Sequence, residues 1–529
     1  MKRSFVVAVD VGTGSARAGV IDRSGELMAR AEHSIAMNRP KADHAEHDSE
    51  DIWRAVCQAV RSARDQAGVS SDEIDGIGFD ATCSIVVRDE DGAQVSVSAG
   101  EEDRWDTIVW LDHRAIAEAD RCTQTGHRVV DYAGGAISPE MATPKLLWLK
   151  ENLPKSWRRA CHVFDLADFL TWKASGSTAR SQCTLTCKWT YLAHEPEPWA
   201  ADYLDAIGLS DLLKRGGLPE RATPVGSDLG PLTAEAAAAL GLSTTTRVAA
   251  GLIDAYAGTL GAIGGYAGEP DVLPRQVALI AGTSSCIMVL SPEPFRMPGV
   301  WGPYFGAALP GLWLTEGGQS VSGALLDHII RIHGGGLPVE RETHRRICAR
   351  IGELRHEEGP DLAGRLHVLP DFHGNRSPLG DPHAVGVISG LTLDPSFDGL
   401  CRLYWRTAVA IALGIRHIIE AMNDHGHRID TLHVVGGHTK NPVLMELYAD
   451  ATGCTLVEPA TDDAVLLGTG MIAAVAAGWH PTLAESCRAL HRPGRSRKPS
   501  EGAQGRFDRD YSAMRMMLGH RADLDRLRH

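Results

Sequence analysis

The hydrophobic pattern of the chain contains one short unit twice: an apolar run, a polar turn and a second apolar run. The first copy spans residues 5–21 and turns at Gly12-Thr13-Gly14-Ser15. The second spans residues 277–290 and turns at Gly282-Thr283-Ser284-Ser285. Each copy predicts a β-hairpin whose turn offers backbone N–H groups and hydroxyls, which is a geometry suited to phosphate. Because the copies lie about half the chain apart, we expect one phosphate-binding hairpin in each of two domains.

The rest of the pattern alternates between short apolar runs, which predict strands, and helical spacing of apolar residues such as Ile52, Val56 and Val60. In the first half we expect strands over residues 74–80, 104–111 and 247–253 and helices over 51–66, 144–150 and 254–263; in the second half we expect helices over 400–422 and 441–452 and a strand over 432–435. A hairpin followed by βα units, repeated in both halves, is typical of ribonuclease-H-like domains.

The length of the chain sets the domain organisation. At 529 residues it exceeds the usual size of a single core. The glycine-rich segment 264–270 is a natural linker. We therefore expect an α/β protein with two ribonuclease-H-like domains, residues 1–265 and residues 266–529, around a central cleft that clamps a nucleotide.

Composition narrows the partners and the compartment. The formal net charge of −14 argues against nucleic acid or an anionic membrane as a partner. Eleven scattered cysteines fit reduced thiols. Asp10 interrupts the first apolar run too early for a signal peptide, and the apolar stretch 464–479 predicts a buried core helix rather than a membrane span. These features predict a cytoplasmic protein.

Other nucleotide-binding motifs do not fit the chain. The dinucleotide fingerprint G-x-G-x-x-G would need a third glycine after Gly12 and Gly14, but that position is Arg17, and no Walker motif is present. An ordinary hairpin is the simpler interpretation of one Gly-Thr-x-Ser turn alone. Asp10 at a strand end, the second copy of the turn, and Gly436-Gly437, where backbone can approach adenine and ribose, together favour nucleotide binding.

These residues resemble the FGGY carbohydrate kinases, members of the actin-like (actin/hexokinase-type) ATPase superfamily that include glycerol kinase, xylulokinase and ribulokinase. The resemblance covers roughly residues 4–479 and rests on motifs that recur in order: Asp10 to Ser15, Trp110 to Ala115, Gly251 to Ala255, Asn375 to Leu379, and Val435 to Gly437 with Asn441. Gly78 to Ser84, Cys187-Lys188-Trp189 and Glu316 to Ser320 are most similar to the ribulokinase-like branch. Two positions depart from the family pattern, His47 and Val385-Gly386. These departures bear on how the substrate fits and not on the reaction.

The resemblance implies an ATP site, a Mg²⁺ site and a catalytic base. Asp10, an oxygen ligand at a strand tip, would help to hold Mg²⁺ through water, and Asp254, where a strand ends and a helix begins, would be the general base that takes the sugar hydroxyl proton. Asp10 as a turn residue and Asp254 as a helix cap are the simpler alternatives. The residues expected to bind ATP are Gly12, Thr13, Gly14, Ser15, Arg17, Gly282, Thr283, Ser284, Gln319, Gly436, Gly437 and Asn441.

The sugar is expected to meet several polar groups. They are Ala81 through its backbone, Thr82, Cys83, Ser84, Asp112, His113, Lys188, Asp254 and Glu316. Alternatives remain open: residues 112–114 could form a salt-bridge cluster at the surface, Lys188 could be a solvated strand lysine, and Glu316 could be a cap. Trp110 and Trp189 are expected in the core rather than as sugar platforms.

The resemblance therefore implies an ATP-dependent kinase for the terminal hydroxyl of a ketopentose, most simply D-ribulose giving D-ribulose 5-phosphate. L-ribulose, ribitol and xylulose remain alternatives, because no motif records stereochemistry. An actin-like ATPase or binding module without sugar phosphorylation, and a sugar-sensing relative without activity, are alternatives of other classes. A homodimer is compatible with the family.

Overall fold

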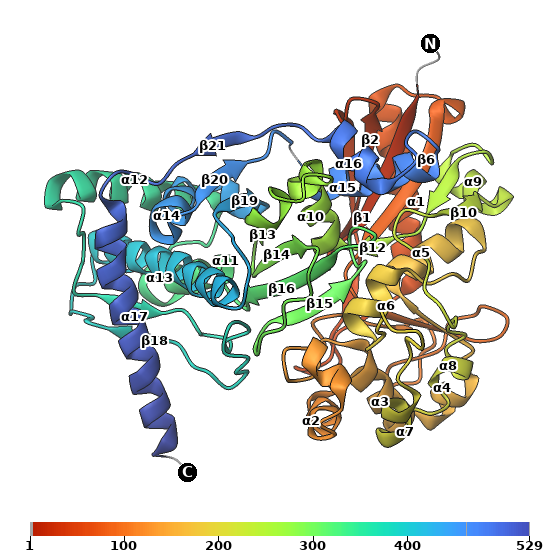
Figure 1. Ribbon diagram of the computed structural model, residues 1–529, viewed down its shortest axis with the longest axis horizontal. Helices are drawn as coiled ribbons and strands as arrows, with labels where there is room; N and C mark the ends of the chain where they lie inside the picture. Colours follow the sequence, from red (N-terminus) through yellow and green to blue (C-terminus); the bar gives the residue numbers. More distant parts are fainter. Residues whose placement is uncertain (1–3, 462, 528–529) are drawn as a thin grey trace.

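The computed structural model describes residues 4–461 and 463–527 and has two α/β lobes side by side (Figure 1). The central sheet of the N-terminal lobe consists of β1 (Phe5–Val11), β2 (Ser15–Asp22), β3 (Leu27–Ser34), β6 (Ile74–Ala81), β10 (Asp228–Pro231), β11 (Arg247–Ala249) and β12 (Leu252–Ile253). Its order is β10-β11-β6-β1-β2-β3, and β12 also pairs with β6.

The C-terminal lobe has a second sheet of the same design. Its strands are β13 (Gln276–Ala281), β14 (Ser285–Ser291), β15 (Trp301–Phe305), β16 (Trp313–Gln319), β19 (Thr431–Val435), β20 (Thr455–Glu458) and β21 (Arg495–Arg497), in the order β15-β16-β14-β13-β19-β20-β21. In both sheets a hairpin strand pairs antiparallel with its successor and parallel with a later strand: β1 with β2 and β6, β13 with β14 and β19. This repeat confirms the ribonuclease-H-like prediction.

Helices cover both sheets, and two small sheets complete the lobes. The helices of the first half are α1 (Ser49–Ala67), α2 (Ile116–Gln124), α3 (Ala142–Asn152), α4 (Pro154–Arg159), α5 (Leu166–Ser175), α6 (Gln182–Lys188), α7 (Ala201–Ala206), α8 (Leu212–Arg215), α9 (Ala234–Leu240) and α10 (Asp254–Ile263). Those of the second half are α11 (Gly323–His333), α12 (Arg341–Glu358), α13 (Phe397–Asp424), α14 (Pro442–Thr452), α15 (Ala464–Ala476), α16 (Leu483–Leu490) and α17 (Ala503–Arg526). The small sheets contain β4 (Met37–Asn38), β5 (Glu46–His47), β7 (Ile85–Arg88), β8 (Thr107–Ile108) and β9 (His162–Asp165), and β17 (His367–Leu369) with β18 (Val387–Ser389).

Helix α1 has the apolar periodicity that the sequence predicted. Its apolar stripe of Ile52, Val56 and Val60 is buried against the first sheet, as predicted. The Asp48 side chain accepts hydrogen bonds from the first backbone N–H groups, and Gly68 ends the helix in the left-handed conformation. Local signals and tertiary packing therefore agree over this segment.

Two predicted strands were wrong in extent. The strand expected over 104–111 shrinks to β8, because residues 104–106 and 109–111 lie in turns and irregular segments around it. The strand expected over 247–253 is interrupted at Ala250-Gly251 and forms β11 and β12. A Cβ atom at Gly251 would lie 2.7 Å from the carbonyl oxygen of Phe79, so the close approach of β6 requires glycine there.

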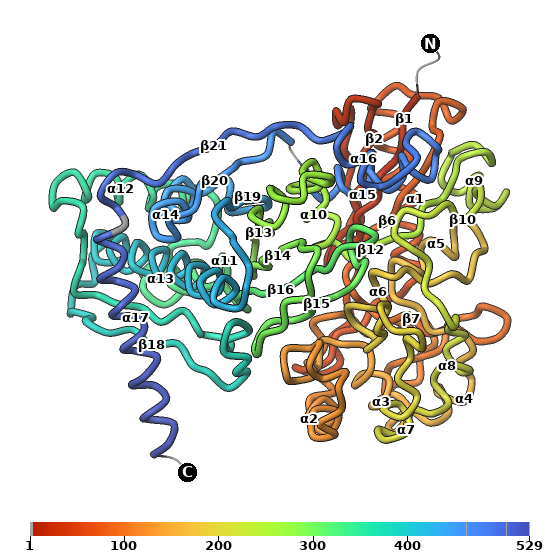
Figure 2. The backbone as a smooth tube through the Cα atoms, viewed as in Figure 1, coloured from red at the N-terminus to blue at the C-terminus, as the bar shows by residue number. Residues whose placement is uncertain are grey.

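The second half of the chain also contributes to the first lobe. Helix α15 packs on β1 and β6 and against α10, and a Cβ atom at Gly78 would collide with the backbone of Thr469. Most of α15 is buried, which confirms the core helix predicted over 464–479. No helix in the described ranges 4–461 and 463–527 is long and apolar enough to cross a membrane. After α16 the chain returns through β21 to the C-terminal lobe and ends in α17 (Figure 2).

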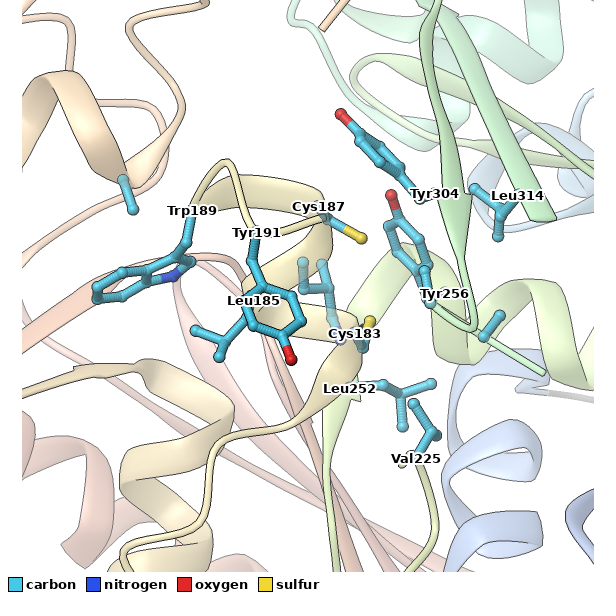
Figure 3. Packing of buried hydrophobic residues seen from close by; sticks show 14 of the residues in the cluster. Cys183, Leu185, Cys187, Trp189, Tyr191, Val225, Leu252, Tyr256, Tyr304 and Leu314 are labelled. Carbon is cyan, nitrogen blue, oxygen red and sulfur yellow. Dashed lines mark hydrogen bonds between the residues drawn. The ribbon is translucent and has the colours of Figure 1, made fainter. Parts of the chain in front are cut away.

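One hydrophobic cluster contains residues of both lobes. Side chains of α6 and the following turn pack in one cluster with Tyr256 of α10, Tyr304 of β15 and Leu314 of β16 (Figure 3). Trp189 is fully buried in this cluster, as predicted for a core residue. The two lobes therefore share a continuous hydrophobic core.

Candidate active site

The first hairpin turn lies at the carboxyl end of β1, and at Gly14 it faces open space. Gly12 N–H donates to the carbonyl of Ser15 at 3.0 Å, which closes the turn. A Cβ atom at Gly14 would meet no atom within 4 Å. The Thr13 hydroxyl accepts a hydrogen bond from Trp110 Nε1 at 2.9 Å, so Trp110 is half-buried against the turn rather than in the core. The core position expected for Trp110 was therefore wrong.

The second hairpin turn is closed by a tighter backbone hydrogen bond and is held by neighbouring elements. Gly282 N–H donates to the carbonyl of Ser284 at 2.9 Å, and the Thr283 carbonyl accepts from Ser322 N–H at 3.0 Å. A Cβ atom at Gly282 would again meet nothing within 4 Å. His438 Nε2 lies 2.9 Å from the carbonyl of Gly282 and ties the loop after β19 to this turn.

The residues expected around adenine and ribose have structural partners of their own. Gly436 has φ +93°, and a Cβ atom there would lie 2.5 Å from the carbonyl oxygen of Ala281. Asn441 caps α14 by accepting from two backbone N–H groups and donates to the Tyr404 hydroxyl at 3.1 Å. Gln319 is buried and donates to the carbonyl of Ile411 on α13 at 3.1 Å. These bonds position the loops, and direct contact of Asn441 and Gln319 with ATP stays a prediction.

A pair of buried aspartates lies beside the first hairpin. Asp10 and Asp80 are register partners on the parallel strands β1 and β6, and both are fully buried. Burial raises the pKa of Asp10 to about 7, although Arg17, whose Nη2 lies 2.7 Å from Asp10 Oδ2, opposes the shift. Burial and the charge of Asp10 raise the pKa of Asp80, whose carboxylate accepts from the Thr469 hydroxyl.

Asp10 fits a water-mediated Mg²⁺ site. Its two carboxylate oxygens are buried, and among the described residues their neighbours include Arg17, which forms an ion pair with Asp10, and the Asp80 carboxyl. Over the same residues, no group of three or more His, Cys, Asp or Glu side chains forms a ready protein cage for a metal. Mg²⁺ usually keeps several waters and binds through one or two carboxylates and the phosphates of a substrate, which matches this donor set.

Asp254 is the first residue of α10 and lies at the same end of the N-terminal sheet as the first hairpin turn. Its neighbour Ile253 pairs with Ala81 across β12 and β6, and Ala81 pairs with Val11 of β1, so the three strand ends meet there. Asp254 is half-buried, and its Oδ1 accepts from Ala255 N–H at 2.7 Å. Burial raises the pKa of Asp254, and this N–H and the charges of Arg17 and Lys188 oppose the shift. Asp254 thus lies within the electrostatic reach of both the first hairpin and a second polar cluster.

The second cluster contains residues from both lobes. Lys188 at the end of α6 is buried, with its Nζ 4.3 Å from the ring centre of Trp301. Burial works to lower the pKa of Lys188, but the opposing charge of Glu316 raises it above its usual value. Glu316 Oε2 accepts from the Tyr256 hydroxyl at 2.7 Å. Lys188 is therefore not a solvated lysine, and Glu316 lies in β16 with a tyrosine as its partner rather than acting as a cap.

Three members of this cluster were missed by the sequence analysis. Arg376 Nη2 lies 3.3 Å from Glu140 Oε1 across the lobes, and its guanidinium is 5.4 Å from the ring centre of Trp301. Arg376 lies inside the Asn375 to Leu379 motif, so its position was signalled although its contacts were not. Glu140 follows a Ser-Pro turn and Trp301 lies in a short edge strand, and neither pattern indicates a ligand-binding role.

The loop after β6 presents small polar groups to the same region. Thr82 Oγ1 and Ser84 Oγ lie 3.0 Å apart, and Ser84 Oγ accepts from Trp110 N–H at 3.2 Å. Burial raises the pKa of the Cys83 thiol to about 12, so at neutral pH the thiol is protonated and can donate a weak hydrogen bond. Ala81 is fully buried at the end of β6.

Asp112 and His113 diverge in their surroundings. Asp112 is fully buried, and its carboxylate accepts from Ala45 N–H and from the backbone and guanidinium of Arg114. Arg114 also pairs with Glu46, so the salt bridges of the alternative are present, but its surface position was wrong because the cluster is buried. Asp112 therefore has few acceptor positions left for a sugar. His113 is half-buried and stacks on His373 of the other lobe with ring centres 6.4 Å apart.

His438 gives acid sensitivity to the second hairpin. A carbonyl can only accept, so Nε2 donates to Gly282 and neutral Nδ1 accepts from Tyr448 at 2.8 Å. Burial lowers the pKa of His438 to about 4. In the unfolded chain the imidazole binds a proton near pH 6.5, whereas in the folded protein it stays neutral down to about pH 4. The contribution of neutral His438 to the free energy of unfolding is therefore complete above pH 6.5 and is lost as the pH falls toward 4. Between pH 7 and pH 5 the wild type should lose about 2 kcal/mol more unfolding free energy than His438→Gln, which has no imidazole to protonate.

Urea unfolding of the wild type and of His438→Gln at pH 7 and pH 5 measures this difference. Other buried histidines cancel in the comparison, since both proteins contain them. An equal loss of unfolding free energy in the two proteins would show that His438 is not held neutral.

Models of the FGGY carbohydrate kinases match residues 5–261 (N-terminal domain) and residues 277–477 (C-terminal domain). The chain belongs to the FGGY family of carbohydrate kinases. This FGGY kinase is 44% identical over 98% of its length to an FGGY carbohydrate kinase domain-containing protein of Danio rerio, of which 98% is covered. It is 35% identical over 97% of its length to a D-ribulokinase of Saccharomyces cerevisiae, of which 77% is covered.

Solved structures support the fold. The xylulose kinase from Rhodospirillum rubrum has a TM-score of 0.79 at 22% identity and covers 98% of this chain and 99% of its own. The Plasmodium falciparum glycerol kinase with ADP has a TM-score of 0.74 at 14% identity and covers 98% of both chains. At these identities the likeness concerns the fold, which is that of the actin-like ATPases.

Proposed function

We propose that this carbohydrate kinase transfers the γ-phosphoryl group of ATP to the terminal hydroxyl of a ketopentose, with D-ribulose as the substrate and D-ribulose 5-phosphate as the product. The observation that carries the proposal is the place of Asp254 in the fold: Ile253 before it pairs with Ala81, whose partner Val11 leads into the first hairpin turn, and Tyr256, two residues after it, donates to Glu316. The relative named D-ribulokinase and ribulokinases of Staphylococcus species at 26% identity favour a pentulose.

Each part of the site has a role in this reaction. The two turns would hold the phosphates from opposite lobes, with Arg17 adding a positive charge near them. Asp10 would hold Mg²⁺ through water, and Mg²⁺ would neutralise the charge that develops on the transferred group. Asp254 would accept the hydroxyl proton as the new bond to phosphorus forms. Lys188, Glu316 and the loop over residues 81–84 would bind the sugar hydroxyls.

The sugar-dependent release of ADP tests the proposal. Purified protein with ATP and Mg²⁺ is offered D-ribulose, L-ribulose, D-xylulose and ribitol in parallel, with a sugar-free control. We expect D-ribulose to give the highest kcat/KM. A higher kcat/KM with another member of the panel would replace the substrate. ADP release that ignores every sugar would favour an actin-like ATPase and would contradict sugar phosphorylation.

Tyr256 should support the sugar-binding acid. Its hydroxyl donates to Glu316, and Tyr256 lies two residues after Asp254 and packs beside Cys183 and Cys187 of α6 (Figure 3). We expect Tyr256→Phe to raise the KM for the ketose about tenfold, the equivalent of one hydrogen bond to a charged group, with the KM for ATP unchanged. Steady-state kinetics with each substrate varied in turn measures the split.

Tyr203→Phe is the matched control, because it removes another fully buried hydroxyl. A Tyr256→Phe enzyme whose KM for the ketose equals that of the wild type would show that Glu316 does not need this donor.

A further inference from the structure

The last helix lies outside the part of the chain matched by the family models, which ends at residue 477. Helix α17 lies across the C-terminal lobe beside β18 and projects beyond it (Figure 1). Two buried or half-buried arginines of α13 bind it: Arg406 Nη2 lies 2.6 Å from Asp510, and Arg416 Nη1 lies 2.7 Å from Asp508. These two ion pairs hold the first half of α17 on the lobe.

The far end of α17 supplies a buried cation. Arg521 is only 5% exposed, although it lies near the end of a helix whose neighbouring residues are largely exposed. Its Nη1 pairs with Asp371 Oδ2 and donates to the carbonyl of Val385 at 3.3 Å. Asp371 is 7% exposed, so both members of the ion pair are removed from water. Such a pair is costly to break on one side only, because an uncompensated buried charge remains.

Asp371 begins a segment that we name the cleft loop, residues 371–379. Its other carboxylate oxygen, Oδ1, accepts from Asn375 Nδ2 at 2.9 Å. Asn375 Oδ1 in turn accepts from Leu379 N–H at 3.1 Å, and Asn375 N–H donates to the carbonyl of Asp381 at 2.8 Å. The Arg521–Asp371 pair therefore fixes the side chain around which the loop is folded.

The opposite side of the cleft loop faces the N-terminal lobe. Arg376, directly after Asn375, reaches Glu140 and the ring of Trp301, beside Lys188. His373 stacks on His113 of the N-terminal lobe. The loop thus connects a buried ion pair at α17 with the polar cluster assigned to the sugar.

We propose that Arg521 is a positioning residue for the sugar substrate: through Asp371 and Asn375 it holds the cleft loop so that Arg376 reaches Glu140 and Trp301 in the polar cluster assigned to the sugar. The inference rests on the proposed sugar site and adds α17 to it. Without Arg521 the Asp371 carboxylate would be buried without a counter-charge, and the loop would move to hydrate it. That movement would withdraw Arg376 from Glu140 and Trp301, while the two phosphate hairpins lie on other elements and would keep their geometry.

Kinetics of Arg521→Ala in the full-length protein tests the proposal. We expect the KM for the ketose to rise about tenfold, as for the loss of one charge-assisted hydrogen bond, while the KM for ATP and kcat stay within about twofold. Arg521→Lys, which restores the charge, should recover most of the loss. Arg515→Ala removes an exposed cation from the same helix and is the matched control. Equal rises in both KM values, or none, would overturn the proposal.

A double-variant cycle tests the route through the loop. In an Arg376→Ala background, Arg521→Ala should add little, because the group that it positions is already absent. Fully additive effects would overturn the route. If Arg521→Ala does not fold, Asp371→Asn, which removes the charge of the partner but keeps an acceptor for Asn375, should give the same rise in the KM for the ketose.

Hydrogen exchange separates this inference from the proposed function. The amides of residues 371–379 should exchange faster in Arg521→Ala than in the wild type, and Arg515→Ala should not change them. This readout needs no sugar, so an enzyme that ignores ketoses would contradict the proposed substrate and still leave the positioning step testable. Unchanged exchange in Arg521→Ala would overturn the positioning role even in an enzyme that phosphorylates D-ribulose.

Discussion

Replacing Asp254 with alanine is expected to lower kcat by about 10²–10⁴, the usual contribution of a positioned general base. The affinity for ATP should persist, because the phosphate hairpins are held by backbone bonds and by Ser322 and His438 rather than by Asp254. The raised pKa of Asp254 makes its carboxylate a better base at neutral pH than an exposed aspartate. Single-turnover kinetics and nucleotide titration calorimetry measure the two quantities separately.

Asp254→Asn is the matched variant for this experiment. It keeps the size of the side chain and its acceptor for the Ala255 N–H, but it cannot take a proton. We expect it to be as inactive as Asp254→Ala. Turnover near that of the wild type in Asp254→Asn would exclude proton transfer to this residue and would leave helix capping as its role.

Replacing Asp10 with asparagine is expected to have the second-largest effect, a fall in kcat of about 10²–10³. Asp10 is buried beside Arg17 and Asp80, so the substitution removes a negative charge where Mg²⁺ would bind and leaves Arg17 without its nearest anion. The concentration of Mg²⁺ needed for half-maximal rate should rise. Titration of Mg²⁺ at saturating ATP and ketose measures this shift, and equilibrium binding of the ketose should stay unchanged.

Asp22→Asn, at the far end of β2, controls for the loss of one carboxylate charge from the same hairpin. It should leave the Mg²⁺ requirement as in the wild type. An Asp10→Asn enzyme that loses turnover but keeps the wild-type Mg²⁺ requirement would place Asp10 in a structural role with Arg17 rather than at the metal.

The fold could be predicted from local sequence patterns because the strand, turn and helix patterns all indicated the same architecture. The apolar runs of the two hairpins, the stripe of α1 and the βα alternation predicted the repeated sheet that the structure contains. The failures came where tertiary contact overrides pattern. The apolar run over residues 247–253 is continuous in sequence, yet the close approach of Phe79 at Gly251 divides it.

The candidate site was predictable only in part. Lys188 and Glu316 were named from the resemblance, and the structure places both in one charged cluster. Asp112 was named as well, but its carboxylate is engaged by Arg114 and Ala45. Glu140 and Arg376, which are 236 residues apart, form an ion pair that no local pattern could indicate. Side-chain pairing across lobes depends on how the sheets and loops pack, and single-chain periodicity does not record it.

By itself, the sequence determined the duplicated α/β architecture, the two Gly-Thr-x-Ser hairpin turns and the family, because strand, turn and helix preferences act over a few neighbouring residues. Only the tertiary structure decided which charges meet: Asp10 with Asp80, Tyr256 with Glu316, and Arg521 with Asp371. The reason is physical. A buried charge or hydroxyl takes its properties from whichever group the fold brings within a few ångströms, and those groups come from distant parts of the chain.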